Sequence, residues 1–117
     1  MPQIVNNGSE LIRINTAKNC VEYSNNNGYS WYSRYSGSSC GTFHDLLYYG
    51  KDLLAATSKG VYYSNNDGHS WYSRYSTTSS GCGEFLSLSD GGREVLASTS
   101  RGFYYSNNEG RSWYKRG

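Results

Sequence analysis

Three cations stand at matching positions in this chain, and grouped cations are the feature of the sequence with the clearest chemistry. Lys59 and Arg101 each precede a glycine in a short turn, in "SKG" and "SRG", and Lys18 takes the corresponding place in "TAKNC". Ammonium and guanidinium groups that lie close together attract phosphate and carboxylate groups. We therefore predict a site for a small polar or anionic ligand where these turns meet; charged turn residues without any ligand are the more common outcome of such a pattern.

His44 and Asp45 are the candidates for proton transfer, because an imidazole beside a carboxylate can act as a general acid and base. Neighbouring residues of a strand point to opposite faces, so we expect one of these side chains to be buried and the other solvated, without contact between them. We assign both to the predicted ligand site as polar groups, and not as a catalytic pair.

Aromatic and basic residues are interleaved in "WYSRYS", which begins at Trp71. With a period of two, Tyr72 and Arg74 share one face of a strand, and a ring beside a guanidinium suits a sugar or a nucleobase. Arg34 and Lys115 are expected at the equivalent positions of the other copies. Packing between sheets uses the same residue types, and we favour it over ligand binding.

The cysteines, Cys20, Cys40 and Cys82, are three in number, and an odd count does not fit a framework of disulfides. Cys40 and Cys82 occupy matching places, in "SSCGTF" and "SGCGEF". We expect half-buried thiols. A Cys40 to Cys82 bridge or a metal site is the alternative, and no C-x-x-C or Cys/His spacing supports the metal. No cofactor is expected.

Length and charge limit the class of protein. The chain has 117 residues, enough for one small domain, and a net charge of +2, which is too small for a charge-driven binder of duplex nucleic acid or membranes. No apolar run approaches the roughly 20 residues that span a bilayer, and "MPQIVNNGSE" lacks the order of a secretory signal. We expect a cytosolic protein as written, with a removed leader or a truncated chain left open.

The elements that position these residues follow from a repeat. Trp31, Trp71 and Trp113 are separated by 40 and 42 residues, the length of a four-stranded propeller blade. Fourteen glycines against one proline describe a turn-rich β protein. We predict one all-β domain of three blades, at about 1–36, 37–78 and 79–117. The expected strands are 3–8, 11–16, 21–26 and 30–35; 42–50, 53–58, 61–66 and 71–76; and 84–92, 94–100, 103–108 and 112–116.

Each hairpin between the third and fourth predicted strands carries one eight-residue pattern, "SNNNGYSW", "SNNDGHSW" or "SNNEGRSW". The pattern resembles the Ser-x-Asp-x-Gly-x-Thr-Trp sequence of the Asp-box, or BNR repeat, in the propellers of sialidases, sorting receptors and photosystem assembly factors. The resemblance implies a structural turn with a positive φ at glycine, backbone amides capped by the central side chain and an anchoring tryptophan. The residues concerned are Ser24, Asn26, Gly28 and Trp31; Ser64, Asn66, Gly68 and Trp71; and Ser106, Asn108, Gly110 and Trp113. Because asparagine replaces the central aspartate, calcium binding is not expected there.

Three blades do not close a ring. Propellers typically have about four to eight blades, and an open arc leaves the outer faces of the first and third blades exposed. We expect both outer faces to be as apolar as an ordinary blade interface, and we predict a head-to-tail homodimer that closes as a six-bladed propeller. A fragment of a longer propeller, or another assembly of more chains, is the alternative.

The resemblance also bears on function through what the chain lacks. Sialidase-type enzymes bring three clustered arginines, a tyrosine nucleophile with its glutamate, and an acid/base aspartate, and this set is not identifiable here; H-E-x-x-H is absent too. We predict a non-enzymatic binding module for a glycan or an anionic metabolite such as a nucleotide, at the loops beside the channel. The alternatives are a structural or protein-interaction propeller, as in assembly factors and phage or virion parts, and a phage-type sponge that sequesters a nucleotide.

Overall fold

The computed structural model describes residues 4–36, 40–76 and 82–116, and the regular elements in these ranges are all β-strands. They form three four-stranded antiparallel sheets, in which each strand pairs with the next one along the chain. Sheet 1 contains β1 (Val5–Asn6), β2 (Leu11–Asn15), β3 (Cys20–Ser24) and β4 (Tyr32–Ser36). Sheet 2 contains β5 (Phe43–Tyr49), β6 (Asp52–Thr57), β7 (Gly60–Ser64) and β8 (Tyr72–Ser76). Sheet 3 contains β9 (Phe85–Asp90), β10 (Val95–Thr99), β11 (Gly102–Ser106) and β12 (Tyr114–Lys115).

The all-β class and the four-stranded units predicted from the repeat are confirmed. The predicted unit boundaries near residues 37 and 79 lie outside the described residues. In the part of the chain that the structure describes, no helix is long and apolar enough to cross a membrane.

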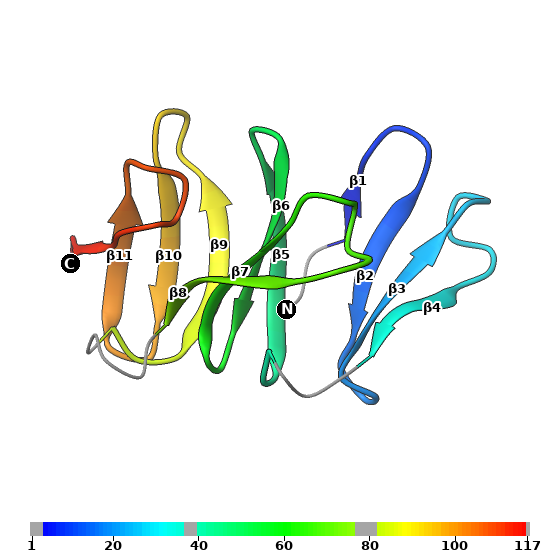
Figure 1. The fold of residues 1–117 in the computed structure, drawn as a ribbon, viewed down its shortest axis with the longest axis horizontal. Helices are drawn as coiled ribbons and strands as arrows, with labels where there is room; N and C mark the ends of the chain where they lie inside the picture. The colour runs from blue at the N-terminus through cyan, green and yellow to red at the C-terminus, as the bar shows by residue number, and fades with distance from the viewer. Residues whose placement is uncertain (1–3, 37–39, 77–81, 117) are drawn as a thin grey trace.

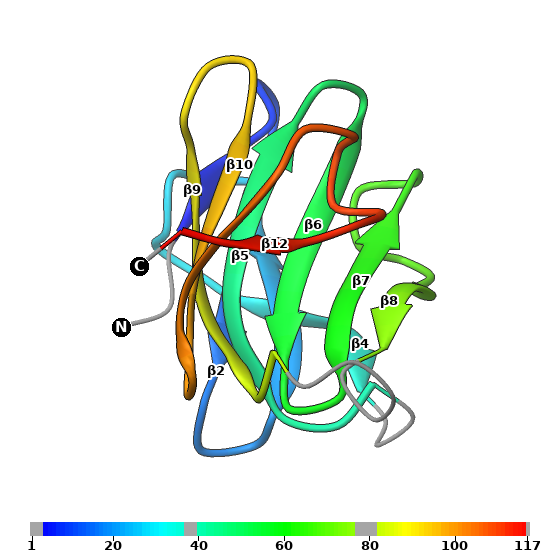
Figure 2. The same cartoon turned by 90° about the vertical axis from the view of Figure 1, so that its left-hand side faces the viewer.

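The three sheets stand side by side along the longest dimension of the molecule, with sheet 2 between the other two (Figure 1). β5 packs against β9 of sheet 3 and against β2 of sheet 1. Figure 2 turns the sheet 3 end toward the viewer and shows the sheets as successive layers. The first strands of neighbouring sheets therefore lie close together.

Apolar residues fill both spaces between neighbouring sheets. In β6, Leu53 and Ala55 belong to the core between sheets 1 and 2, whereas Leu54 and Ala56 belong to the core between sheets 2 and 3. Side chains of a strand alternate between its two faces, which explains this division. Sheet 2 is consequently buried on both faces.

A tryptophan from the following sheet anchors each of these cores. Trp71 is 8% exposed and its ring centroid lies 5.5 Å from that of Phe43; Trp113 is 7% exposed and lies 5.1 Å from Phe85. Trp31 is covered by no other described sheet and is only half-buried, with the guanidinium of Arg13 4.0 Å above its ring. The predicted anchoring role thus holds for two of the three tryptophans.

The outer face of sheet 1 is polar. Ile12 and Ile14 point into the core, so Arg13, between them on β2, points to the outer face. There the guanidinium of Arg13 pairs with the carboxylate of Glu22 at 3.0 Å, and the Asn15 amide donates to the same carboxylate at 3.1 Å. The expectation that both outer faces are equally apolar is wrong for sheet 1.

The outer face of sheet 3 exposes a large apolar side chain. Phe103 is the second residue of β11 and is 62% exposed, whereas Val61, the second residue of β7, is fully buried at 0%. Sheet 3 therefore presents to solvent a surface that sheet 2 presents to its neighbour.

Candidate functional site

Five of the seven predicted ligand residues belong to one edge of the three sheets, at the bottom of Figure 1. They are Lys18, Lys59, Arg101, His44 and Asp45, whereas Tyr72 and Arg74 lie away from this edge. The second strand of each sheet turns into the third at this edge, and β5 and β9 begin there because Phe43 pairs with Thr57 and Phe85 with Thr99. We call this edge the cationic rim; it consists of the turns that carry Lys18, Lys59 and Arg101, together with the segments that lead into β5 and β9.

A threonine builds the turn that presents Lys59. The hydroxyl of Thr57 donates to the carbonyl of Gly60 at 3.1 Å and accepts from the amide of Lys59 at 3.1 Å. The same two bonds, at 3.0 and 3.1 Å, join Thr99, Gly102 and Arg101. The predicted equivalence of Lys59 and Arg101 is confirmed, and both residues are exposed.

The segment entering β5 is docked on this turn. The amide of Thr42 donates to the hydroxyl of Ser58 at 2.9 Å, and the Ser58 amide donates to the Thr42 carbonyl at 3.0 Å. Gly41 has a φ of +82°, and a Cβ there would lie 2.4 Å from the Ser58 Oγ and 3.0 Å from the Lys59 Cγ. The stem of Lys59 therefore lies over a glycine, and Gly83 stands in the same relation to Ser100 and Arg101.

Lys18 is exposed on a turn of different construction. The side-chain oxygen of Asn15 accepts from the amide of Lys18 at 3.2 Å. Asn19 has a φ of +51°, and its side chain donates to the Gly41 carbonyl at 3.0 Å and accepts from the Phe43 amide at 2.8 Å. This turn connects sheet 1 to sheet 2 and places a third cation at the rim.

His44 and Asp45 have separate partners. A bulge in β5 falls between Phe43 and Asp45. Asp45 is buried, and its carboxylate accepts from the amides of Leu46 and Leu88, each at 2.9 Å. His44 contacts the carboxylate of Glu84 through Nε2. The expectation of one buried and one partly solvated side chain is confirmed, and sequence analysis missed Glu84.

Arg74 lies between sheets 2 and 3. Its side chain is 5% exposed and donates to the carboxylate of Asp52 at 3.0 Å and to the carbonyl of Glu109 at 3.1 Å. Its guanidinium also lies 4.0 Å from the centroid of the Tyr63 ring. Tyr72 pairs with Tyr63, and their ring centroids are 5.6 Å apart. Tyr72 and Arg74 therefore both contact the Tyr63 ring and share a face, as predicted, although Tyr72 is 49% exposed. A register shift in the β7–β8 pairing breaks the simple alternation. The geometry favours the packing interpretation of Arg74.

The counterpart of Arg74 in sheet 3 is Arg116, and not Lys115 as predicted. Lys115 pairs with Tyr104, as Ser73 pairs with Tyr62 in sheet 2. Arg116 binds Glu94 through two hydrogen bonds of 2.9 Å and lies 4.0 Å from the centroid of the Tyr105 ring. Arg34 makes the contacts that Arg74 makes, with Glu10, Tyr23 and the carbonyl of Asp67. We call this recurring arginine the clamp.

The Asp-box turns have the hydrogen bonds that the resemblance implies. The Ser64 hydroxyl donates to the Asn66 side-chain oxygen at 2.7 Å and accepts from the Gly68 amide at 2.8 Å, and Asn66 accepts from the Ser70 amide at 2.9 Å. The other two turns repeat these bonds. Gly28, Gly68 and Gly110 have φ values of +89°, +94° and +95°. The turns are structural units that an asparagine completes as an aspartate would.

The three cysteines form no disulfide, and all are buried, so the expectation of half-buried thiols is wrong. Cys40 belongs to the core between sheets 1 and 2 and Cys82 to the core between sheets 2 and 3, so the alternative of a bridge between them is wrong. Within residues 4–36, 40–76 and 82–116, no group of three or more His, Cys, Asp or Glu side chains is placed to hold a metal ion.

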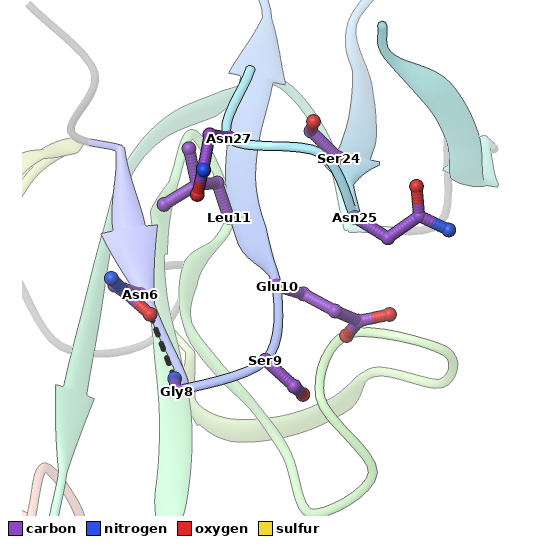
Figure 3. Close-up of a pocket in the computed structure, with 8 residues that line it drawn as sticks. All are labelled: Asn6, Gly8, Ser9, Glu10, Leu11, Ser24, Asn25 and Asn27. Carbon is purple, nitrogen blue, oxygen red and sulfur yellow. Dashed lines mark hydrogen bonds between the residues drawn. The ribbon is translucent and has the colours of Figure 1, made fainter. Parts of the chain in front are cut away.

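Figure 3 shows a small polar pocket of about 70 Å³ at the edge opposite the cationic rim. In it, the Asn6 side chain accepts from the Gly8 amide at 2.7 Å. Glu10 contributes a carboxylate whose pKa is lowered by hydrogen bonds from Arg34. The lining residues are Asn6, Gly8, Ser9, Glu10, Leu11, Ser24, Asn25 and Asn27. They include no positively charged side chain.

A larger hollow of about 300 Å³ lies on the outer face of sheet 3. It is lined by Ser87, Ser89, Leu96, Ala97, Ser98, Phe103, Tyr104 and Arg116. Neither this hollow nor the polar pocket contains a predicted ligand residue, and the rim cations are displayed on exposed turns.

No protein-family model matches the chain, and no curated protein matches its sequence. Solved structures do match its fold. An ancestral GH74 enzyme matches with 16% identity and a TM-score of 0.69 over 96% of this chain and 17% of that one. YCF48 bound to D1 peptide matches with 12% identity and a TM-score of 0.70 over 97% of this chain and 39% of that one. The computationally designed Ika4 protein matches with 8% identity and a TM-score of 0.58 over 97% of this chain and 64% of that one.

The GH74 and YCF48 proteins are β-propellers. The three sheets have a propeller-type fold. This chain spans less than two thirds of the length of each of these neighbours. At such identities the likeness concerns the fold alone, and the membership in the Asp-box family stays a prediction that the turn geometry supports.

Proposed function

We propose that this chain is a non-enzymatic binding protein whose working form is a six-bladed β-propeller made by two copies. The observation that carries the proposal is that large apolar residues are exposed on the outer sides of sheet 1 and sheet 3, at positions that are buried in sheet 2. Phe103 is 62% and Ile4 58% exposed, whereas their counterparts Val61 and Leu46 are both 0% exposed. Exposed apolar surface of this kind marks a protein interface.

A ring of two chains accounts for both ends at once. Sheet 3 of each copy receives sheet 1 of the other, and a two-fold axis along the channel generates this contact twice, leaving no free face. The six sheets fall within the range of about four to eight blades in closed propellers.

The cationic rim is the proposed ligand site of the closed ring. Lys18, Lys59 and Arg101 are all exposed on one edge, and a second copy doubles them. Grouped cations beside a channel concentrate the electrostatic potential that attracts an anion. We propose a small anionic ligand, such as a nucleotide or an acidic glycan, which includes the case of a protein that sequesters a nucleotide.

The acidic groups at the rim support binding over catalysis. Asp45 is buried and joins sheet 2 to sheet 3 through the Leu88 amide, and Glu84 is engaged by His44. A general base must reach the proton that it abstracts, and these carboxylates have structural partners instead.

A second candidate is a protein-interaction propeller. Tyr32, Tyr72 and Tyr114 recur on the outermost strands and are 49%, 49% and 48% exposed. Tyrosine is enriched in protein interfaces because its ring is large and carries a polar tip. Of the neighbours by fold, YCF48 was solved with a bound peptide.

Light scattering tests the assembly. The proposal expects twice the chain mass at micromolar concentration, with dissociation and loss of structure on the same dilution curve, because an obligate dimer has no stable folded monomer. A well-folded monomer, or an odd-numbered oligomer, contradicts the six-bladed form.

Thermal shift against inorganic phosphate, nucleotides and acidic sugars tests the rim, because a ligand that binds the native state raises its melting temperature. Lys59→Ala with Arg101→Ala should weaken the binding of any hit, more at low salt than at high salt. The matched control is Lys51→Ala with Arg111→Ala, which removes the same charge from the opposite edge. Equal low-salt affinity of both double variants refutes the rim site, and an effect of Tyr72→Ser on a protein partner alone would favour the second candidate.

A further inference from the structure

We propose that a polar seam forms the junction between two chains and selects sheet 1 of one chain as the partner of sheet 3 of the other. The seam consists of Arg13, Asn15 and Glu22 on sheet 1 and of Ser87, Ser89 and Ser98 on sheet 3 of the second copy. This inference rests on the two-chain closure proposed above and names the residues that determine its specificity.

The junction between sheets 2 and 3 provides the template. On its sheet 2 side, Leu54, Ala56 and Val61 are each 0% exposed and share one cluster with Trp113 and Phe85 of sheet 3. A Cβ built on Gly110 would lie 3.6 Å from the Val61 Cγ1, so the Asp-box turn of the following sheet rests on this valine.

Strand register identifies the corresponding positions on the outer face of sheet 3. Leu96 and Ser98 pair with Tyr105 and Phe103 as Leu54 and Ala56 pair with Tyr63 and Val61. In the first strand, Ser89 pairs with Leu96 as Leu47 pairs with Leu54. Sheet 3 thus has smaller or more polar side chains where sheet 2 has Leu47 and Ala56, and the result is the 300 Å³ hollow.

On the outer face of sheet 1, by contrast, a side chain is larger than the one at the corresponding position of sheet 2. Arg13 pairs with Glu22 across β2 and β3, as Ala55 pairs with Tyr62 across β6 and β7. Arginine is therefore larger than the residue it replaces, and its side chain is 35% exposed. A larger residue on one face and smaller residues on the other are complementary in volume. Serine hydroxyls both donate and accept hydrogen bonds, so they can pair with the donors of Arg13 and the acceptors of Glu22 that remain unused when these residues are buried.

The clamp arginines independently indicate that sheet 1 of a second copy is the partner of sheet 3. Arg34 and Arg74 each donate at 3.1 Å to a carbonyl of the following Asp-box turn, at Asp67 and Glu109. Their side chains are 5% exposed, whereas that of Arg116 is 48% exposed although it holds its own Glu94 in the same way.

The matching acceptor for Arg116 is on sheet 1. Asn27 corresponds to Asp67 and Glu109 in the Asp-box turns, and the three residues have φ values of +61°, +60° and +67°. The carbonyl of Asn27 in a second copy is thus oriented to accept from Arg116, as the carbonyls of Asp67 and Glu109 accept from the other clamp arginines. A pairing of sheet 3 with another sheet 3 would offer Arg116 no such turn.

The seam also discriminates against wrong pairings. Two outer faces of sheet 1 would bring like charges together, and Arg13 with Glu22 would lose solvation without new partners against a fully apolar face. Apolar contact alone would not distinguish these arrangements, because the hydrophobic effect has no direction.

A face-exchange experiment tests the seam. Ser89→Leu with Ser98→Ala gives sheet 3 the residues of sheet 2. It should weaken the dimer about tenfold or more, because the hydrogen-bonding groups of Arg13 and Glu22 that their mutual ion pair does not use would be buried without partners. Adding Arg13→Ala with Glu22→Tyr gives sheet 1 the residues of an internal face, and should restore the dimer. The matched control, Ser33→Leu with Ser73→Ala on the outer strands, should leave the affinity unchanged. The readout is the dissociation constant by sedimentation, with circular dichroism to confirm folding.

A photo-crosslinking residue at Phe103 tests which faces meet. The expected adduct is with the segment from Asn27 to Trp31 of the other copy, since Gly28 is the counterpart of Gly110. An unaltered dissociation constant in the Ser89/Ser98 variant, or an adduct with residues 85–116 of the other copy, overturns the seam while the wild type remains a dimer. A monomeric wild type overturns the closure itself and the seam with it.

Discussion

Sheets 2 and 3 carry matching residues on the side that faces away from sheet 1, but only sheet 2 has a neighbour there. Val61 is 0% and Phe103 62% exposed, and the clamp arginines Arg74 and Arg116 have side chains 5% and 48% exposed. The hydrogen-bonded ladder, the Asp-box turn and the pairing of arginine with carboxylate are present in both sheets. A sheet of this type therefore builds its own frame, and only its apolar face depends on the next sheet.

The largest expected effect comes from placing a carboxylate on each of these two faces. Val61→Asp should prevent folding, with a loss of more than about 4 kcal/mol, because the charge enters a core without a partner. Phe103→Asp should weaken dimerisation without disrupting the core of the chain, so the variant should fold at high protein concentration and unfold at a higher concentration than the wild type on dilution. Circular dichroism and sedimentation separate the two outcomes, and Tyr72→Asp on an outer strand is the control. Equal unfolding of both variants would break the comparison.

The tryptophans sharpen the same comparison. Trp71→Ala should lower the free energy of unfolding by about 3–5 kcal/mol, since the side chain is 8% exposed between sheets 1 and 2. Trp31→Ala should cost less in a monomer, because no preceding sheet covers Trp31, and should weaken the dimer. Urea unfolding at two protein concentrations distinguishes these effects. A Trp31→Ala loss equal to that of Trp71→Ala, and independent of concentration, would contradict the interpretation.

The smallest expected effect concerns acid stability and the clamp. Hydrogen bonds from Arg34 hold the pKa of Glu10 below its ordinary 4.5, and hydrogen bonds from Arg116 lower the pKa of Glu94. A carboxylate with a lowered folded-state pKa stabilises the fold fully above its unfolded pKa, and this contribution is lost as the pH falls through the folded value. The melting temperature should therefore fall below about pH 4.5.

Glu10→Gln should flatten this acid dependence more than Glu94→Gln, because the Arg34 side chain is 5% exposed and that of Arg116 is 48% exposed. Melting curves between about pH 3 and pH 6 check the order. The reverse order would mean that burial between sheets does not strengthen the clamp.

The repeat spacing was sufficient to predict the strands and their order, because each sheet is a meander whose hydrogen bonds join consecutive segments. Prediction failed at the bulges. A register shift in the β7–β8 pairing places Ser73 and Tyr75 on opposite faces of sheet 2, which a period of two does not foresee. The partner of His44, Glu84, is 40 residues away in the sequence. A signal for the polar face of sheet 1 was present, since Arg13 and Glu22 replace an alanine and a tyrosine of the other copies.

The sequence by itself determined the Asp-box turns. Their hydrogen bonds link serine, asparagine and glycine within a few residues, so the three copies have the same geometry although Gly110 is buried and Gly28 is only partly buried. Only the tertiary structure decided which faces became core, because the burial of a side chain on a sheet depends on the sheet that packs against it. Val61 and Phe103 hold one position in the repeat; sheet 3 packs on Val61, which is 0% exposed, and no described sheet packs on Phe103, which is 62% exposed.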